Sequence, residues 1–168
     1  MPPPSPPPPS LKAYPSGDLR NANLRDADLK NFDLSNRDLS GADLTDADLR
    51  NAVLSSADLS SADLTRVTLI GAFLNEAKLV GAVLTGANLT RADLSSADLT
   101  GVSGLDADLT NANLVGAKLV GADLTGAKLD RADLSSVDLT GFRGIDIVGT
   151  PLLPSGWGLS DGTIVAIT

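Results

Sequence analysis

Residues 42–66 read ADLTD-ADLRN-AVLSS-ADLSS-ADLTR, five consecutive groups in which a small residue and a polar residue precede Leu and two turn-forming residues follow it. This register runs from Leu19 to Leu139 and has 25 Leu positions, of which 24 hold Leu and one holds Gly104. We call the position directly before Leu the polar slot and the position two before it the small slot. The small slot is Ala in 19 of the 25 repeats, and the polar slot is Asp or Asn in 17.

A period of five residues excludes both regular secondary structures as the frame of the chain. In an α-helix a step of five residues rotates a side chain by about 140°, so the Leu side chains would face every direction. In a straight strand the same step sends successive Leu side chains to opposite faces. A short extended segment followed by a turn, repeated around one axis, places every Leu and Ala inward. The sequence therefore predicts a solenoid.

A second period of 40 residues constrains the size of one coil. Residues 80–107 and 120–147 are identical at 20 of 28 positions, and the register breaks at Gly104 and Gly144 are also 40 residues apart. The spacing fits two coils of four repeats, although one coil of eight repeats satisfies it as well. With four repeats per coil, both glycines fall on the same side, and we expect Val102 and Phe142 to turn inward where Leu is missing.

The repeat A-D-L-x-x, as in Ala42–Asp46 and Ala62–Arg66, resembles that of the pentapeptide-repeat proteins over residues 17–143. The resemblance implies an all-β fold, a right-handed quadrilateral β-helix with one repeat on each side. At four repeats per coil, the 25 repeats make about six coils.

Composition divides the chain into three predicted segments. Residues 1–16 hold eight of the ten prolines and read as an extended Pro-rich tail. Residues 17–144 form the repeat β-helix, and residues 145–168 form a C-terminal cap rich in large apolar side chains. Within the cap, Asp161-Gly162 is a hairpin signal between Trp157–Ser160 and Thr163–Ile167, and we expect Trp157 to pack over the last coil.

The residue types exclude most catalytic chemistry. The chain has no Cys and no His, which removes disulfides, thiol nucleophiles, imidazole bases and ordinary zinc sites. Its many aspartates recur in one repeated environment, whereas catalytic carboxylates need environments that differ. We therefore expect hydrogen bonding at the corners of the coils, and predict no enzyme activity and no catalytic, cofactor or metal site.

Charge and hydropathy restrict the partners. With 13 Lys and Arg against 21 Asp and Glu, the net charge of −8 argues against direct binding of nucleic acid. No apolar run is long enough to span a membrane, and the first residues lack the features of a signal peptide. This favours the cytoplasm, with a mature exported form as the alternative. Because a solenoid has open ends, we expect a monomer or a weak end-to-end dimer.

Departures from the repeat point to one candidate interaction patch. Val53 and Phe73 occupy polar slots 20 residues apart, so they stack on one side of neighbouring coils, and Ile70 lies at the turn before Phe73. An exposed apolar patch of this kind marks a partner site. Drift on a tolerant repeat surface gives the same pattern, and the sequence alone does not separate the two.

Two functions remain. The first is a non-enzymatic scaffold for protein interaction, with partner and pathway unknown. The second comes from the resemblance, because some pentapeptide-repeat proteins mimic double-stranded DNA, bind type II topoisomerases and confer quinolone resistance. A narrow acidic rod suits that role, but Lys78, Lys118 and Lys128 interrupt the predicted aspartate rows.

Overall fold

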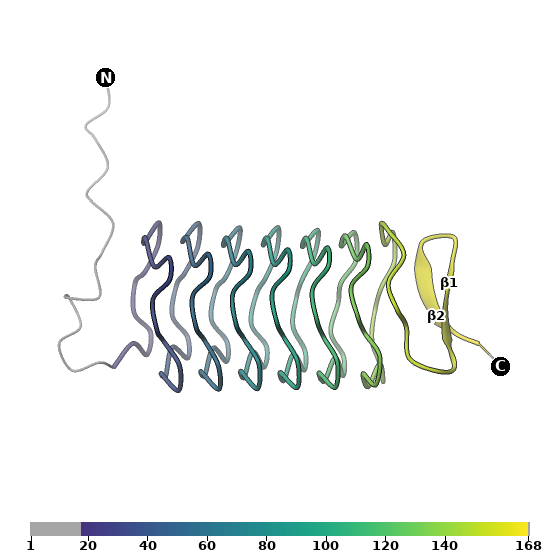
Figure 1. Ribbon diagram of the computed structural model, residues 1–168, viewed down its shortest axis with the longest axis horizontal. Helices are drawn as coiled ribbons and strands as arrows, with labels where there is room; N and C mark the ends of the chain where they lie inside the picture. Colours follow the sequence, from purple (N-terminus) through teal and green to yellow (C-terminus); the bar gives the residue numbers. More distant parts are fainter. Residues whose placement is uncertain (1–17, 168) are drawn as a thin grey trace, which may run out of the picture.

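The computed structural model describes residues 18–167, which form one elongated shaft of stacked coils (Figure 1). Neighbouring coils are joined by parallel β-bridges between polar-slot residues 20 positions apart, from Asn23 and Asp43 at one end to Lys128 and Val148 near the other. A coil of 20 residues with four sides is therefore confirmed, and the alternative of eight repeats per coil is wrong. The expected Pro-rich tail of residues 1–16 lies outside the described residues.

Each side ends in a four-residue turn that begins at Leu. In the turn that starts at Leu44, the N–H of Ala47 donates to the Leu44 carbonyl at 3.0 Å. The third residue of the turn, Asp46, has a positive φ of 59°. Gly adopts this left-handed conformation freely, and Asn and Asp tolerate it better than most residues. This requirement explains why the second position after Leu is most often Gly, Asn or Asp.

The core is the inside of the shaft. Each of the 24 Leu side chains in the register has 3% or less of its surface exposed, and the Ala side chains of the small slots are buried between them. Burying one Leu side chain stabilises a fold by about 1.5–3 kcal/mol relative to leaving it exposed. From Leu19 to Leu139, a long stack of Leu therefore supplies the core without aromatic side chains in the buried cluster.

The two breaks in the Leu register lie on the same side of the shaft, as expected for a 20-residue coil. At Gly104, Val102 is buried, but Leu124 of the next coil also leans into the gap: a Cβ on Gly104 would lie 2.5 Å from its Cδ2. At Gly144, a Cβ would lie 2.6 Å from Cε1 of Phe142. The expected filling by Val102 and Phe142 is confirmed, with Leu124 as an additional contributor.

The last coil is covered by an antiparallel hairpin of β1 (Trp157–Ser160) and β2 (Thr163–Ala166), with Asp161-Gly162 as its turn (Figure 1). Ile164 of β2 is buried, and its N–H donates to the Gly144 carbonyl at 2.9 Å. Trp157 is half-buried and packs against the core, as the sequence predicts. Within residues 18–167, no helix has the length and apolar character needed to cross a membrane.

Candidate interaction surface

The polar slot has a structural role that follows from counting backbone donors. In residues 44–48, the N–H groups of the first, third and fifth residues donate to neighbouring coils, and that of the fourth closes the turn. Only the second, Thr45, has no backbone acceptor. Its N–H donates instead to Oδ1 of Asp43, in the polar slot two residues earlier, at 3.0 Å. We call the N–H of the residue that follows Leu the post-Leu N–H.

This role accounts for the consensus of the repeat without exception. In all 17 repeats whose polar slot is Asp or Asn, its side-chain oxygen accepts the post-Leu N–H. In the other eight repeats, the described residues provide no acceptor for it. Asp and Asn are therefore selected by the turn, because their short side chains reach the backbone two residues on.

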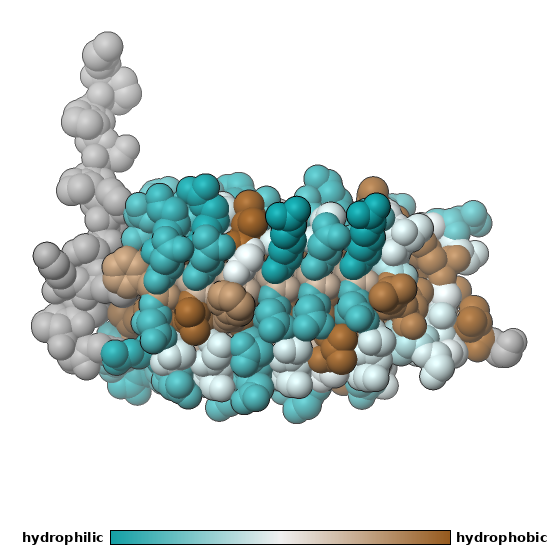
Figure 2. All heavy atoms as spheres, viewed as in Figure 1, coloured by the Kyte–Doolittle hydropathy of each residue, from teal (hydrophilic) through white to brown (hydrophobic). Residues whose placement is uncertain are grey.

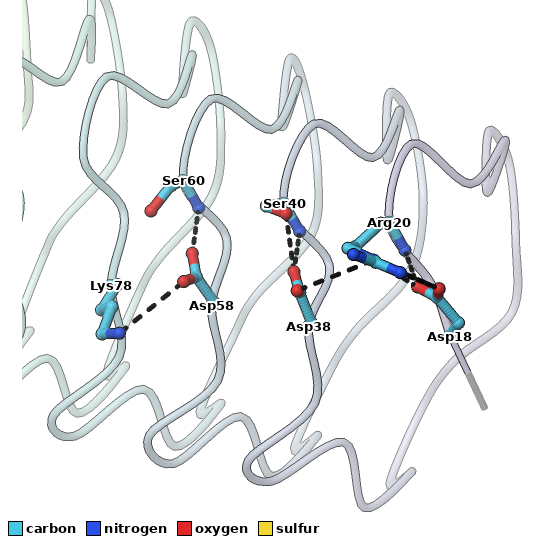
Figure 3. A network of polar contacts seen from close by, with 7 residues as sticks. All are labelled: Asp18, Arg20, Asp38, Ser40, Asp58, Ser60 and Lys78. Atoms are coloured by element: carbon cyan, nitrogen blue, oxygen red, sulfur yellow. Dashed lines mark hydrogen bonds and ion pairs between the residues drawn. The ribbon is translucent and has the colours of Figure 1, made fainter.

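The aspartates consequently form rows along the shaft. In Figure 3, Asp38 and Asp58 accept hydrogen bonds from Ser40 and Ser60 on successive coils. Asp18 and Lys78 lie at the two ends of the row, and Arg20 contacts both Asp18 and Asp38. Lys78 contacts Asp58 with an Nζ to Oδ2 distance of 3.8 Å. Stacked carboxylates repel one another, and these cations offset part of that repulsion.

The same pairing recurs wherever a cation replaces Asp in a polar slot. Each such cation contacts the Asp 20 residues earlier. The pairs and their N to O distances are Lys78–Asp58 at 3.8 Å, Lys118–Asp98 at 3.3 Å, Lys128–Asp108 at 3.4 Å and Arg143–Asp123 at 3.7 Å. Because the pairs are largely exposed, each contributes little to stability, about 0–1 kcal/mol.

The hydrogen bonds shift the titration of the carboxylates. Three donors from Arg20 hold the pKa of Asp18 at about 2, the guanidinium bond being the largest cause. The hydroxyl and N–H of Ser35 lower the pKa of Asp33, and those of Thr140 lower the pKa of Asp138. These environments all favour the ionised form, so they suit a permanent hydrogen-bond acceptor and not a general acid.

The structure places the candidate patch on one side of the shaft. Val53 and Phe73 are bridged partners in neighbouring coils; Phe73 is 48% exposed and Val53 is half-buried. Ile70 is half-buried at the turn that leads into Phe73. In Figure 2, apolar side chains interrupt the hydrophilic surface in the middle of the shaft as well as at its ends.

Sequence reasoning missed a larger feature that includes this patch. The polar slots Thr68, Phe73, Lys78 and Val83 occupy the four sides of a single coil, and none of them is Asp or Asn. We call residues 68–87 the aspartate-free coil. The signal was present in the sequence, since no Asp occurs between Asp63 and Asp93. It was overlooked because each departure was considered on its own side.

Other candidate sites are weaker. A polar depression of about 390 Å³, open to solvent, is lined by Asp33, Ser35, Asn36 and Arg37 near the N-terminal end of the shaft. Across residues 18–167, no group of three acidic side chains is placed to hold a metal ion. The apolar patch and the coil that contains it therefore remain the most distinctive surface of the described chain.

The family assignment follows from the repeats themselves. The family model for pentapeptide repeats matches residues 18–36, 33–71, 69–103 and 106–143, in 8 copies. The chain belongs to the pentapeptide-repeat family. No curated protein has a significant sequence match to the chain.

Solved pentapeptide-repeat structures resemble this chain. HetL from the cyanobacterium Nostoc sp. strain PCC 7120, involved in heterocyst differentiation regulation, is 31% identical; the match covers 92% of this chain and 97% of HetL, with a TM-score of 0.29. A pentapeptide-repeat protein of the Arabidopsis thaliana thylakoid lumen is 33% identical over 66% of this chain and 70% of its own, with a TM-score of 0.29. QnrB1, a plasmid-mediated fluoroquinolone resistance protein, is 20% identical over 74% and 83%, with a TM-score of 0.38.

Removing a polar-slot acceptor will destabilise the shaft. Oδ1 of Asp133 accepts the Ser135 N–H at 2.9 Å. We expect Asp133→Ala to lower the free energy of unfolding by about 0.5–1.5 kcal/mol, the net value of one hydrogen bond. Asp133→Asn should stay close to the original, because Asn88 and Asn113 accept the same N–H in their repeats. Urea unfolding followed by circular dichroism measures both, and equal losses in the two variants would contradict this role.

Acid will also destabilise the shaft. The pKa of eleven aspartates is lowered in the folded chain: Asp18, Asp33, Asp43, Asp46, Asp48, Asp58, Asp98, Asp108, Asp123, Asp133 and Asp138. A carboxyl group whose pKa is lower in the folded chain than in the unfolded chain stabilises the folded state when it is ionised. This stabilisation is complete above the pKa of the unfolded chain and is lost as the pH falls through the pKa of the folded chain.

We therefore expect the Tm to be nearly constant from pH 7 to 5 and to fall from about pH 4 to 2, where the carboxylates become protonated. Thermal scans at about 1 M salt, in which repulsion among the remaining cations is screened, separate this loss from general charge effects. A Tm that does not change down to pH 2 would show that the aspartates contribute no net stabilisation.

Proposed function

We propose that this pentapeptide-repeat protein is a non-enzymatic scaffold for protein interaction. The observation that carries the proposal is the difference between the two kinds of polar slot. Asp and Asn slots hold the turns, which leaves their carboxylates engaged, whereas Val53 and Phe73 give up that hydrogen bond and present apolar surface to solvent. A rigid shaft with one side modified in this way suits recognition of another protein. The involvement of HetL, which is 31% identical, in heterocyst differentiation regulation is consistent with such a role.

The proposal includes the finer architecture that the family implies. We assign residues 17–144 to a right-handed shaft of about six coils and residues 145–168 to its cap. Within the cap, Val148 and Leu152 are 58% and 60% exposed and continue the polar-slot rows of Lys128 and Asp133. Because a solenoid has open ends, we propose a monomer or a weak end-to-end dimer as the state in solution.

Affinity capture from the native host tests the scaffold role. The comparison uses the unmodified chain and a patch variant, Val53→Asn with Phe73→Asn, whose new amides can accept the Ser55 and Asn75 N–H groups as Asn88 and Asn113 do in their repeats. We expect at least one protein to be retained by the original chain and lost from the patch variant, with circular dichroism confirming that both fold. If both chains retain the same proteins, the patch is not the binding surface. If neither chain captures any protein, the scaffold role is contradicted.

The second candidate is a DNA-mimicking binder of type II topoisomerases. The net charge of −8 and the rows of aspartates favour it. A mimic needs a continuous negative row, however, and the row that begins at Asp33 meets Val53 and Phe73 before Asp93. On a second side, Lys78 and Lys118 replace Asp and neutralise the preceding carboxylate. The likeness to QnrB1, at 20% identity, concerns the fold alone.

We therefore expect micromolar protein neither to inhibit gyrase supercoiling nor to protect gyrase from a quinolone. The local cations leave no extended negative surface, and exposed charges are screened over about 8 Å at physiological salt. A supercoiling assay over a range of salt concentrations measures this, with Asp43→Lys and Asp63→Lys as charge-reversal variants. Salt-sensitive inhibition that either variant weakens would replace the scaffold by the mimic.

A further inference from the structure

The aspartate-free coil differs from the rest of the shaft in its hydrogen bonding. Its four polar slots supply no carboxylate or amide oxygen, so the post-Leu N–H groups of Ile70, Asn75, Val80 and Thr85 have no acceptor among the described residues. In the preceding coil, on the side of the candidate patch, Val53 also supplies no acceptor, so the Ser55 N–H has no hydrogen-bond partner among the described residues. These donors are therefore available to an oxygen from outside the chain.

Two of the donors lie next to the exposed apolar side chains. Val53 and Phe73 are bridged neighbours, and Ser55 and Asn75 follow them by two residues on the same side of adjacent coils. The hydroxyl of Ser55 donates to Oδ1 of Asn75 at 2.7 Å, which ties the two turns together. Adjacent strands are about 4.8 Å apart, so the two N–H groups form a pair at that spacing. A ligand that accepts hydrogen bonds from both N–H groups must place oxygen atoms there, and a neighbouring part of the same ligand will contact Phe73.

The charged residues around this coil bear on the charge of that ligand. Residues 64–92 carry three cations and one carboxylate, Glu76, whereas the whole chain has a net charge of −8. Arg66 is held by Asp46, and Lys78 is 66% exposed and contacts Asp58 at 3.8 Å. Arg91, in the coil after Phe73, is exposed and makes no ion pair with any described residue. On the row of the patch itself, Asp33 and Asp93 flank Val53 and Phe73, and each accepts hydrogen bonds within its own repeat. Arg91 is therefore the cation beside the patch that can attract a carboxylate of the ligand.

We propose that the side of the shaft formed by Val53, Ile70 and Phe73 binds an extended acidic peptide segment that carries a large apolar side chain. The apolar side chain packs on Phe73, and a carboxylate of the segment accepts the N–H groups of Ser55 and Asn75. That carboxylate takes the position which Asp occupies in most other repeats, so the ligand completes the hydrogen-bonding pattern of the coil. The inference rests on the proposed scaffold role and specifies the chemistry of its partner.

Selection from a displayed library of random 12-residue peptides on the full immobilised chain tests this chemistry. We expect the enriched peptides to combine Asp or Glu with Leu, Ile, Phe or Trp. A synthetic peptide of the enriched sequence should bind the patch variant, Val53→Asn with Phe73→Asn, at least tenfold more weakly. The variant provides the missing acceptors from its own chain, so it is expected to fold and to unfold no earlier than the original.

Two further variants provide the controls. Val115→Asn is the matched control, because Val115 is 37% exposed on the same side but its N–H is already accepted by Asn113 at 3.1 Å. It should leave peptide affinity unchanged. Arg91→Ser should weaken binding severalfold and reduce its salt dependence.

Nuclear magnetic resonance gives a direct readout of the hydrogen bonds. Saturating peptide should move the amide proton signals of Ser55 and Asn75 downfield, while the Thr100 amide, already bonded to Asp98, should not change. Peptides that bind the original chain and the patch variant equally would overturn this site but leave the scaffold role intact. Failure to enrich any peptide, enrichment without acidic residues, or self-association that the patch variant abolishes would each overturn the proposed ligand.

Discussion

Each repeat has one N–H that its backbone alone cannot satisfy, and in 17 of the 25 repeats an Asp or Asn side chain accepts it. In the interior coils, four of the five N–H groups in a repeat such as 44–48 find carbonyl acceptors in the same turn or in a neighbouring coil, and only a side-chain oxygen two residues earlier can accept the fifth. The inward Leu side chains provide most of the driving force for folding, but they do not specify the conformation of the corner. Asp and Asn stabilise this conformation, because the longer side chains of Glu and Gln would lose more rotamer freedom in reaching the same N–H.

This requirement gives the acidic surface a structural origin. Placing Asp in the polar slot of every coil stacks carboxylates at the spacing of adjacent strands, where like charges repel. Lys118 and Lys128 each contact the Asp of the preceding coil, and Asn113 donates to Oδ1 of Asp93 at 3.0 Å. The net charge of the chain therefore results largely from turn formation, and negative charge by itself says little about the partner. Function must be sought where the consensus is broken.

The core and the turns were accessible from the sequence, whereas the surface chemistry was accessible only in part. The five-residue register determines which residues face inward, so the burial of Leu94 or Ala97 needs no further information. The packing at Gly104 could not be predicted fully, because Leu124 of the next coil occupies part of the space that the missing Leu leaves. The repeat pattern does not determine the position of that side chain. The patch at Val53 and Phe73 was found from spacing, but the unfilled Ser55 N–H beside it was not. Recognising that donor requires knowing the acceptor of every N–H group in the turn, which only the structure provides.

The aspartate-free coil shows why that inventory matters. Each missing acceptor gives up about 0.5–1.5 kcal/mol of net hydrogen bonding, and one coil gives up four of them. The shaft tolerates the loss because Leu69, Leu74, Leu79 and Leu84 of this coil remain buried and the bridges to both neighbouring coils are intact. Local hydrogen bonding and global packing are thus separable in this architecture. A repeat protein of this kind can change a whole coil for recognition without altering its core, because the side chains that hold the turns face solvent and those that hold the fold do not.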